Sequence, residues 1–177
     1  MASSRKFETL TPRGKAARVA HDVLQQIRIN KLRALRGAYI IATLSRTIEV
    51  GTPVCSLLDT SNSYSCEVCA LGGLFMGLAM NDKSIKVKYR LYSYESFAEP
   101  TDFKHRLTGI FAPNQLNMIE SAFEVQNMIQ GRAVDLDAAG SPDIVAAIKF
   151  GKRYRSDSNR LRAIMNNIVE NRGIFRP

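Results

Sequence analysis

The feature that most constrains the fold is a nearly continuous apolar stretch, Val68–Met80, which contains three glycines. It is shorter than the roughly 18–20 apolar residues that span a bilayer, so we expect it to be buried inside the protein. Each glycine costs about 1 kcal/mol relative to Ala within a helix, which is tolerable where another backbone packs closely. The sequence therefore predicts a buried central helix over Cys66–Met80, with Ser65 as its N-cap.

Apolar residues at three- and four-residue steps predict further helices on both sides of this one. One follows Pro12 for about 16 residues, and another covers Asn114–Ile129 after Pro113. A third is expected to begin after Ser141, which is followed by a proline and an acid in the first turn. The last begins at Ser156 or Asp157 and ends before Gly173.

Alternating apolar and polar residues from Ile85 to Tyr92 are typical of a strand, with Lys86, Lys88 and Arg90 on the polar face. The apolar run Ala38–Leu44 fits either a buried strand or a short helix. The predicted fold class is mainly α, a compact four-to-five-helix domain around a buried central helix, with a small β element. With 177 residues the chain suits a single helical domain over 12–177, preceded by a flexible basic arm over 1–11.

Positive charge is concentrated at the two ends of the chain. The formal net charge of +9 divides into +7 over residues 1–36, −4 over 37–148 and +6 over 149–177. If the ends pack together, one face carries most of the positive potential and favours an anionic partner. Alternatively, the acidic middle neutralises the ends and the charge serves solubility. Both interpretations remain open at this level.

Three features indicate a surface that binds a partner or nucleic acid: a basic arm and helix face near the N-terminus, the basic strand face, and two helices joined by the segment 152–157. The last pair could form a helix-turn-helix, with Arg160 and Arg162 on its exposed second helix. As a plain helical hairpin it needs no nucleic acid. The candidate binding residues are Arg5, Lys6, Arg13, Lys15, Arg18, Lys86, Lys88, Arg90, Lys152, Arg153 and Arg155.

Cys66 and Cys69 form a single C-x-x-C spacing, the only arrangement typical of a metal or redox site. Cys55 with His21 or His105 could complete four zinc ligands. A redox pair is disfavoured because no strand is predicted to run directly into the cysteines. We expect buried, apolar cysteines, and neither a metal nor another cofactor.

The remaining chemistry-bearing residues are sparse. Asp135 and Asp137 offer too few oxygen ligands for a metal, and the two histidines lie in no known catalytic motif. We therefore expect no enzymatic activity. An odd number of cysteines without an export signal favours a reducing compartment, so the protein is predicted to be cytoplasmic and without a membrane partner.

Three segments resemble segments of small phage and prophage proteins, and together they cover about 40 residues: Cys66–Phe75, Phe111–Glu124 and Arg160–Phe175. The resemblance implies a shared fold and a phage origin, and it implies no activity. In that context we expect an accessory protein that binds and inhibits a host protein or nucleoprotein complex in the host cytoplasm, as anti-CRISPR and other anti-defence proteins do. The alternatives are direct DNA or RNA binding and sequestration of an anionic nucleotide signal. The oligomeric state is not predicted.

Overall fold

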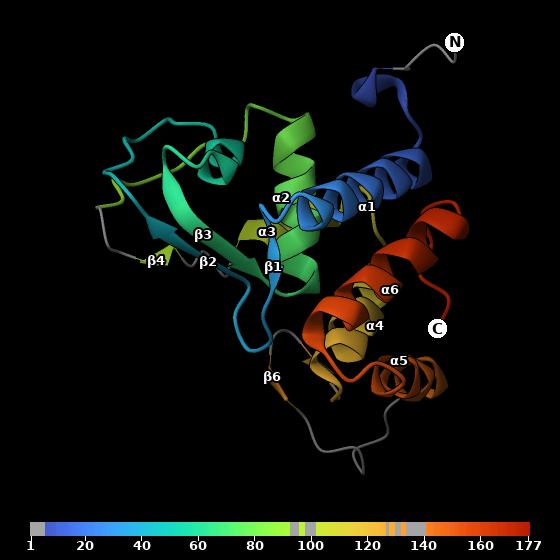
Figure 1. The fold of residues 1–177 in the computed structure, drawn as a ribbon. Helices are drawn as coiled ribbons and strands as arrows, with labels where there is room; N and C mark the ends of the chain where they lie inside the picture. Colours follow the sequence, from blue (N-terminus) through green and yellow to red (C-terminus); the bar gives the residue numbers. More distant parts are fainter. Residues whose placement is uncertain (1–5, 93–95, 98–101, 127, 130–131, 134–140) are drawn as a thin grey trace.

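The computed structural model describes residues 6–92, 96–97, 102–126, 128–129, 132–133 and 141–177. As predicted, the fold is mainly α with a small β element (Figure 1). Within the described residues there are six α-helices, rather than four or five. They are α1 (Pro12–Arg28), α2 (Ala70–Asn81), α3 (Asp102–Leu107), α4 (Pro113–Glu124), α5 (Pro142–Lys152) and α6 (Asp157–Glu170).

The strands form two sheets. The larger has the order β1-β3-β2-β4, in which β1 is parallel to β3 and the other pairs are antiparallel. The smaller pairs β5 with β6. Two short 3-10 helices, η1 (Phe7–Thr9) and η2 (Val54–Leu58), complete the described elements. The strands are β1 (Arg33–Ala34), β2 (Ile40–Leu44), β3 (Ser63–Val68), β4 (Ser96–Phe97), β5 (Met128–Ile129) and β6 (Arg132–Ala133).

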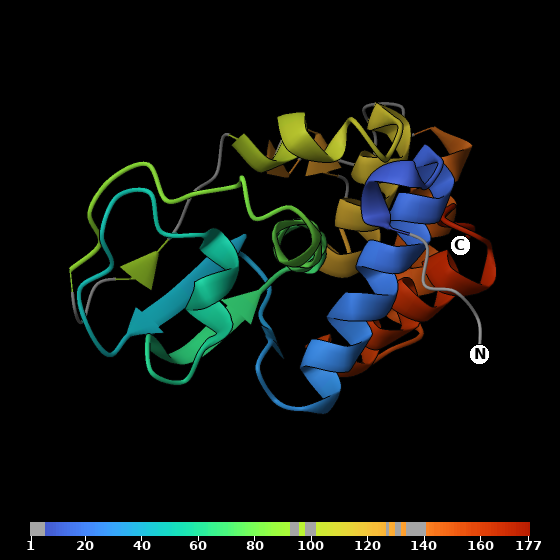
Figure 2. The same cartoon turned by 90° about the horizontal axis from the view of Figure 1, so that it is seen from above.

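The glycine-rich apolar stretch forms α2, in which ten of the twelve residues are buried. Figure 2 shows α2 end-on, with the larger sheet on one side and α1, α4 and α6 on the other. A Cβ atom at Gly72 would collide with the Tyr39 carbonyl oxygen, and one at Gly77 would lie 2.7 Å from the Val19 carbonyl oxygen. The glycines therefore permit two other segments to approach the α2 backbone, as the sequence predicts.

The predicted start of the central helix, at Cys66, was wrong. Residues 63–68 form strand β3, and α2 begins only at Ala70, with Cys69 rather than Ser65 as its N-cap. The reason is pairing: Ala42 lies opposite Cys66 and Ile40 opposite Val68, which extends the buried face of β2 across the sheet. The ambiguous segment 38–44 accordingly contains a strand.

The predicted strand over Ile85–Tyr92 was also wrong, because only isolated bridges to Pro53 and Ile48 form there. The alternation holds in part, since Ile85, Val87 and Leu91 are buried. Tyr89, expected on the apolar face, is 47% exposed. Backbone hydrogen bonds to the segment 48–54 hold these residues in an extended but irregular course.

Helix ends follow local chemistry. Helix α4 stops at Glu124 and not at Ile129, because Val125 adopts the left-handed conformation with φ of 60°. Ser156 caps α6 by accepting a hydrogen bond from the Asn159 N–H at 3.2 Å, and Gly173 has φ of +91° three residues past its end. Helix α3 was not predicted.

The N-terminal arm falls partly outside the described residues, which begin at Lys6. Phe7–Thr9 form η1, and the Lys15 ammonium lies 5.6 Å from the centroid of the Phe7 ring. A flexible arm over residues 1–11 stays a prediction. No helix among the described residues has both the length and the apolar character needed to cross a membrane.

Candidate partner-binding surface

The two basic ends of the chain are packed together. Helix α1 lies along α6, and the backbone after α6 reaches the start of α1. At Gly173 a Cβ atom would collide with the Arg13 carbonyl oxygen, so these backbones are in direct contact. At the other end of the helix pair, the Arg36 N–H donates to Asp157 at 3.3 Å. Helices α1 and α6 are therefore antiparallel, and the condition for a shared basic face is met.

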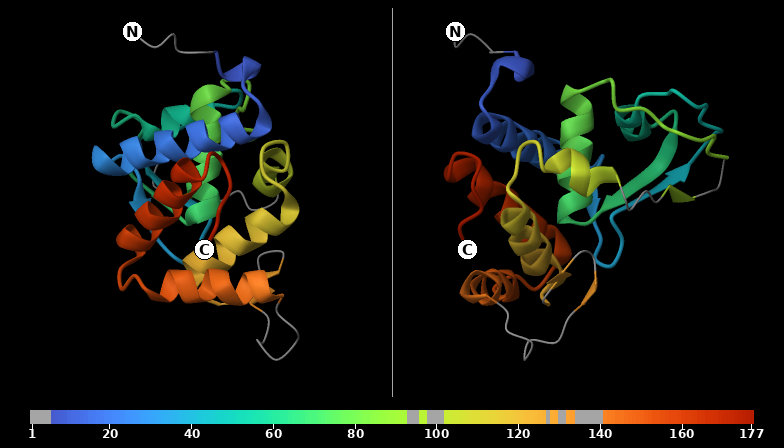
Figure 3. Two further views of the ribbon diagram at one scale, coloured as in Figure 1. Left: turned by 90° about the vertical axis from the view of Figure 1, so that its right-hand side faces the viewer. Right: turned by 180° about the vertical axis from the view of Figure 1, so that it is seen from behind.

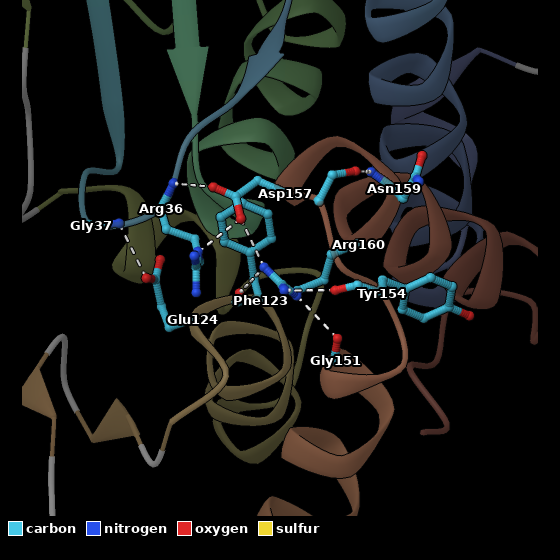
Figure 4. Close-up of polar contacts among 10 residues, drawn as sticks. Arg36, Gly37, Phe123, Glu124, Gly151, Tyr154, Asp157, Asn159 and Arg160 are labelled. Atoms are coloured by element: carbon cyan, nitrogen blue, oxygen red, sulfur yellow. Dashed lines mark hydrogen bonds and ion pairs between the residues drawn. The ribbon is translucent and has the colours of Figure 1, made fainter.

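The turn between α5 and α6 is organised by Arg160, which is only 4% exposed (Figure 4). Its guanidinium donates to the carbonyl oxygens of Gly151 at 3.1 Å and Tyr154 at 2.8 Å, and to that of Phe123 at 3.4 Å. It also pairs with Asp157 at 2.9 Å. Arg160 was predicted to be exposed on a reading face, and this was wrong. The turn carbonyls need donors, and a planar guanidinium supplies several at once.

Asp157 links this turn to the loop between β1 and β2. One carboxylate oxygen accepts from Arg36 Nε at 2.8 Å, while the Gly37 N–H donates to Glu124 at 3.1 Å (Figure 4). Charge-assisted hydrogen bonds of this kind are among the stronger polar contacts in proteins. The α5–α6 turn is thus held from α4, α6 and the β1–β2 loop, which fixes the positions of its exposed side chains.

A buried polar cluster lies beside this network. Tyr39 donates its hydroxyl proton to Glu120 at 2.7 Å, and burial together with this carboxylate raises the Tyr39 pKa. Burial is also the main cause of the raised pKa of Glu124, to which the neighbouring Glu120 contributes. Cys69 lies close enough to both glutamates for their charges to oppose its ionisation.

The cysteines are free, and Cys66 and Cys69 are buried. Burial raises the pKa of each of these two thiols to about 12, so both are neutral near pH 7 and poorly suited to act as nucleophiles. Cys55, in η2, is partly buried. Contrary to our expectation, a strand does run directly into the C-x-x-C spacing; burial, rather than a missing strand, argues against redox chemistry.

His21 and His105, the possible additional zinc ligands, are exposed on α1 and α3. Among the described residues, no group of three or more His, Cys, Asp or Glu side chains is arranged to hold a metal ion. Asp135 and Asp137 lie outside the described residues.

Lys152, Arg153 and Arg155 are exposed together at the end of α5 and in the turn to α6. The Arg153 guanidinium lies 5.6 Å from the centroid of the Phe150 ring, whereas Lys152 and Arg155 have no polar partner within the described part of the chain. We call these three residues the basic turn. It is the densest of the predicted basic sets.

The predicted N-terminal set lies on the same helical side of the molecule. Lys6, Arg13 and Arg18 are exposed, and Arg18 pairs with Asp22 on the next turn of α1 at 3.3 Å. Lys15 is partly covered against Phe7. Arg5 lies outside the described residues.

Lys86, Lys88 and Arg90 are exposed in the segment 83–92, which runs on the sheet side of α2, away from α1 and α6 (Figures 1 and 2). Arg90 is paired with Glu49 at 2.8 Å. The structure therefore separates this set from the other two, and the eleven candidate residues do not form one surface.

A groove of about 510 Å³ runs beside the basic turn, and we call it the α6 groove. Sequence reasoning noted the polar face of α6 but missed the groove, because the aromatic wall comes from the end of α5 and the turn. The regular spacing of Asn159, Arg162 and Asn166 along one face of α6 was the available signal. The lining residues are Phe150, Tyr154, Asn159, Arg162, Ala163, Asn166, Asn167 and Glu170.

Helices α5 and α6 are joined by a four-residue turn, a length found in helix-turn-helix motifs. Their packing differs from that motif, because α5 packs mainly on α4 while α6 packs on α1 (Figure 3). Comparison of the chain with family models, curated protein sequences and solved structures finds no match.

Proposed function

We propose that the chain is a non-enzymatic accessory protein that binds an anionic surface of a host protein or nucleoprotein complex through the basic turn. The observation that carries this proposal is the exposure of Lys152, Arg153 and Arg155 on a turn that Arg160 and Asp157 hold in place. The antiparallel packing of α1 on α6 places Arg13 beside the chain that follows α6, at the far end of this helix pair from the turn. Electrostatic complementarity of this kind guides association and selects partners.

The rigidity of the turn supports a binding role. Arg160 and Asp157 hold its backbone from inside, so the exposed Lys152 and Arg155 are presented without ordering a flexible loop. A preorganised surface loses less conformational entropy on binding. The phage resemblance supplies the biological side of the proposal: inhibition of a host factor, an anti-defence role, in the cytoplasm of the host cell.

Direct binding to DNA or RNA is the second candidate, favoured by Arg162, Asn159 and Asn166 on the open side of α6. Arginine and asparagine are the side chains most suited to read base edges. Burial of Arg160 reduces the reading face that the sequence predicted.

The test is a pull-down from host lysate with the purified chain and a matched pair of charge reversals. The first variant carries Lys152→Glu and Arg155→Glu. The control carries Lys83→Glu and Lys86→Glu, two exposed lysines on the sheet side, and it changes the net charge equally. We expect the first variant to lose the partner and the control to keep it, with melting temperatures near that of the parent.

Equal loss in both variants, or retention by the first, would show that the basic turn is not the interface. Binding to duplex DNA that weakens steeply as the salt concentration rises, without capture of a protein, would favour the second candidate.

A further inference from the structure

We propose that the α6 groove binds a nucleotide unit, either free or within a single strand, with its base against Tyr154 and its phosphate on Arg162. The volume of about 510 Å³ lies within the roughly 300–1,000 Å³ usual for small-ligand sites. At 1.5 Å rise per residue, Asn159 and Glu170 mark ends roughly 16 Å apart along α6. The groove is therefore elongated. Its aromatic, carboxamide and guanidinium side chains can contact a base, a sugar and a phosphate.

The polar side chains that line the groove are available for a ligand. Within the described part of the chain, the side chains of Asn159, Arg162 and Asn166 make no hydrogen bond or ion pair. Asn167 shows the contrast, because its amide binds both the N–H and the carbonyl oxygen of Arg176. Each carboxamide offers a donor and an acceptor side by side, which complements the edge of a base.

Two aromatic side chains, Phe150 and Tyr154, line the groove. The Tyr154 ring is partly exposed and lies 5.4 Å from the Phe150 ring, centroid to centroid. Figure 4 shows that the Tyr154 carbonyl oxygen accepts a hydrogen bond from Arg160 while the Tyr154 ring points away from that network. The backbone of Tyr154 is thus held by Arg160 while its ring packs against Phe150, and stacking on such an aromatic platform tolerates any base.

Charge favours the same ligand. Arg162 lines the groove, and so does Tyr154, which lies between Arg153 and Arg155 of the basic turn. The one carboxylate among the lining residues is Glu170, at the other end of α6. A phosphate is therefore expected on Arg162, which can donate two hydrogen bonds to it, with the base beside it against Tyr154 and both away from Glu170.

A nucleotide unit fits better than duplex DNA. To read a duplex, α6 would have to project into the major groove. Here its polar face instead forms one wall of a groove that Tyr154 and Phe150 also line. A single unstacked base can place its face on Tyr154 and its edge on the carboxamides. A base pair within a duplex cannot, because its faces are covered by the neighbouring pairs.

The experiment is calorimetric titration of the full chain with AMP and with the single-stranded hexamer (dA)6, together with amide NMR spectra to locate the shifts. Arg162→Ala and Asn166→Ala remove two ligand contacts. Arg28→Ala is the matched control, because it deletes an exposed arginine of α1 that neither lines the groove nor belongs to the candidate binding residues. We expect about 10-fold or greater weakening in Arg162→Ala, weaker binding in Asn166→Ala and no change in Arg28→Ala.

Binding of AMP comparable to that of (dA)6 would assign a free nucleotide, whereas binding of (dA)6 alone would assign a single strand. The proposal is overturned if neither probe binds, if Arg28→Ala weakens binding as much as Arg162→Ala, or if a duplex competes better than (dA)6. Because only purified protein is used, this result is independent of the host factor. Retention of the partner by the Lys152/Arg155 variant would overturn the proposed function and leave the nucleotide proposal intact.

Discussion

Single buried charges determine the geometry around the α5–α6 turn. Arg160 satisfies carbonyl oxygens that would otherwise face the interior without donors, and Asp157 neutralises it. Glu124 is less well compensated: it accepts from the Gly37 N–H and is attracted by Arg36, but it faces the carboxylates of Glu120 and Asp157. The ionised carboxylate of Glu124 is therefore unfavourable in the folded state, so stability should depend on the pH at which it ionises.

Glu124→Gln should stabilise the protein at neutral pH. Burial raises the Glu124 pKa above the value of about 4.3 typical of an unfolded chain, so the folded state binds this proton more tightly. The stabilising contribution is therefore complete below about pH 4.3 and is lost as the pH rises through the folded-state pKa. Glutamine resembles the protonated form. In urea unfolding, the free energy of unfolding of the variant should exceed that of the parent at pH 7 and equal it near pH 4.

Glu8→Gln is the control for this series, because Glu8 is exposed in η1. The free energy of unfolding of the Glu8→Gln variant should equal that of the parent at every pH. If Glu124→Gln is instead less stable at pH 7, the contacts of the ionised carboxylate with Gly37 and Arg36 outweigh its burial.

At the scale of elements, sequence periodicity located helices more reliably than it located their ends or the strands. The amphipathic patterns of α1, α5 and α6 were recognisable because each buries one continuous stripe. Strand β3 was not recognisable from the sequence. Its buried residues favour a strand only when β2 lies opposite them, and that pairing is a tertiary effect. Arg160 was misplaced for the same reason: its acceptors come from α4, α5 and the turn.

The two adjacent glycines of α2 should respond differently to alanine. At Gly72 a Cβ atom meets the carbonyl oxygen of Tyr39, and a backbone group cannot move aside without disturbing the sheet. At Gly73 the nearest atoms are Val23 Cγ1 at 3.4 Å and Val68 Cγ2 at 3.5 Å, which are ordinary contacts. We expect Gly72→Ala to lower the free energy of unfolding by about 3 kcal/mol or more.

Gly73→Ala is the matched control, and it should be neutral or stabilising by up to about 1 kcal/mol, since alanine favours the helix. Urea denaturation of both variants measures the difference. Equal stability of the two would mean that α2 does not approach the Tyr39 backbone as closely as described.

For the whole molecule, folding brings together two ends that carry charge of the same sign. The sequence left open whether the acidic middle neutralises them, and the antiparallel packing of α1 on α6 resolves only their position. The ion pairs of Arg18 with Asp22 and of Arg36 with Asp157 compensate part of the charge. Arg13, Arg172 and Arg176 remain near one end of the α1–α6 pair, so their mutual repulsion should oppose folding.

Arg13→Glu should therefore raise the free energy of unfolding at low salt. Part of this gain comes from the helix dipole, because residue 13 lies in the first turn of α1, where a carboxylate contributes about 0.3–1 kcal/mol. The rest comes from attraction to the arginines that follow α6. A double-mutant cycle with Arg172→Gln separates the two parts, since only the second depends on Arg172. The gain should shrink in the Arg172→Gln background and in about 1 M NaCl, where the screening length falls to about 3 Å. A gain that is unchanged by Arg172→Gln would assign the whole effect to the helix dipole, and the basic ends would then not interact through these residues.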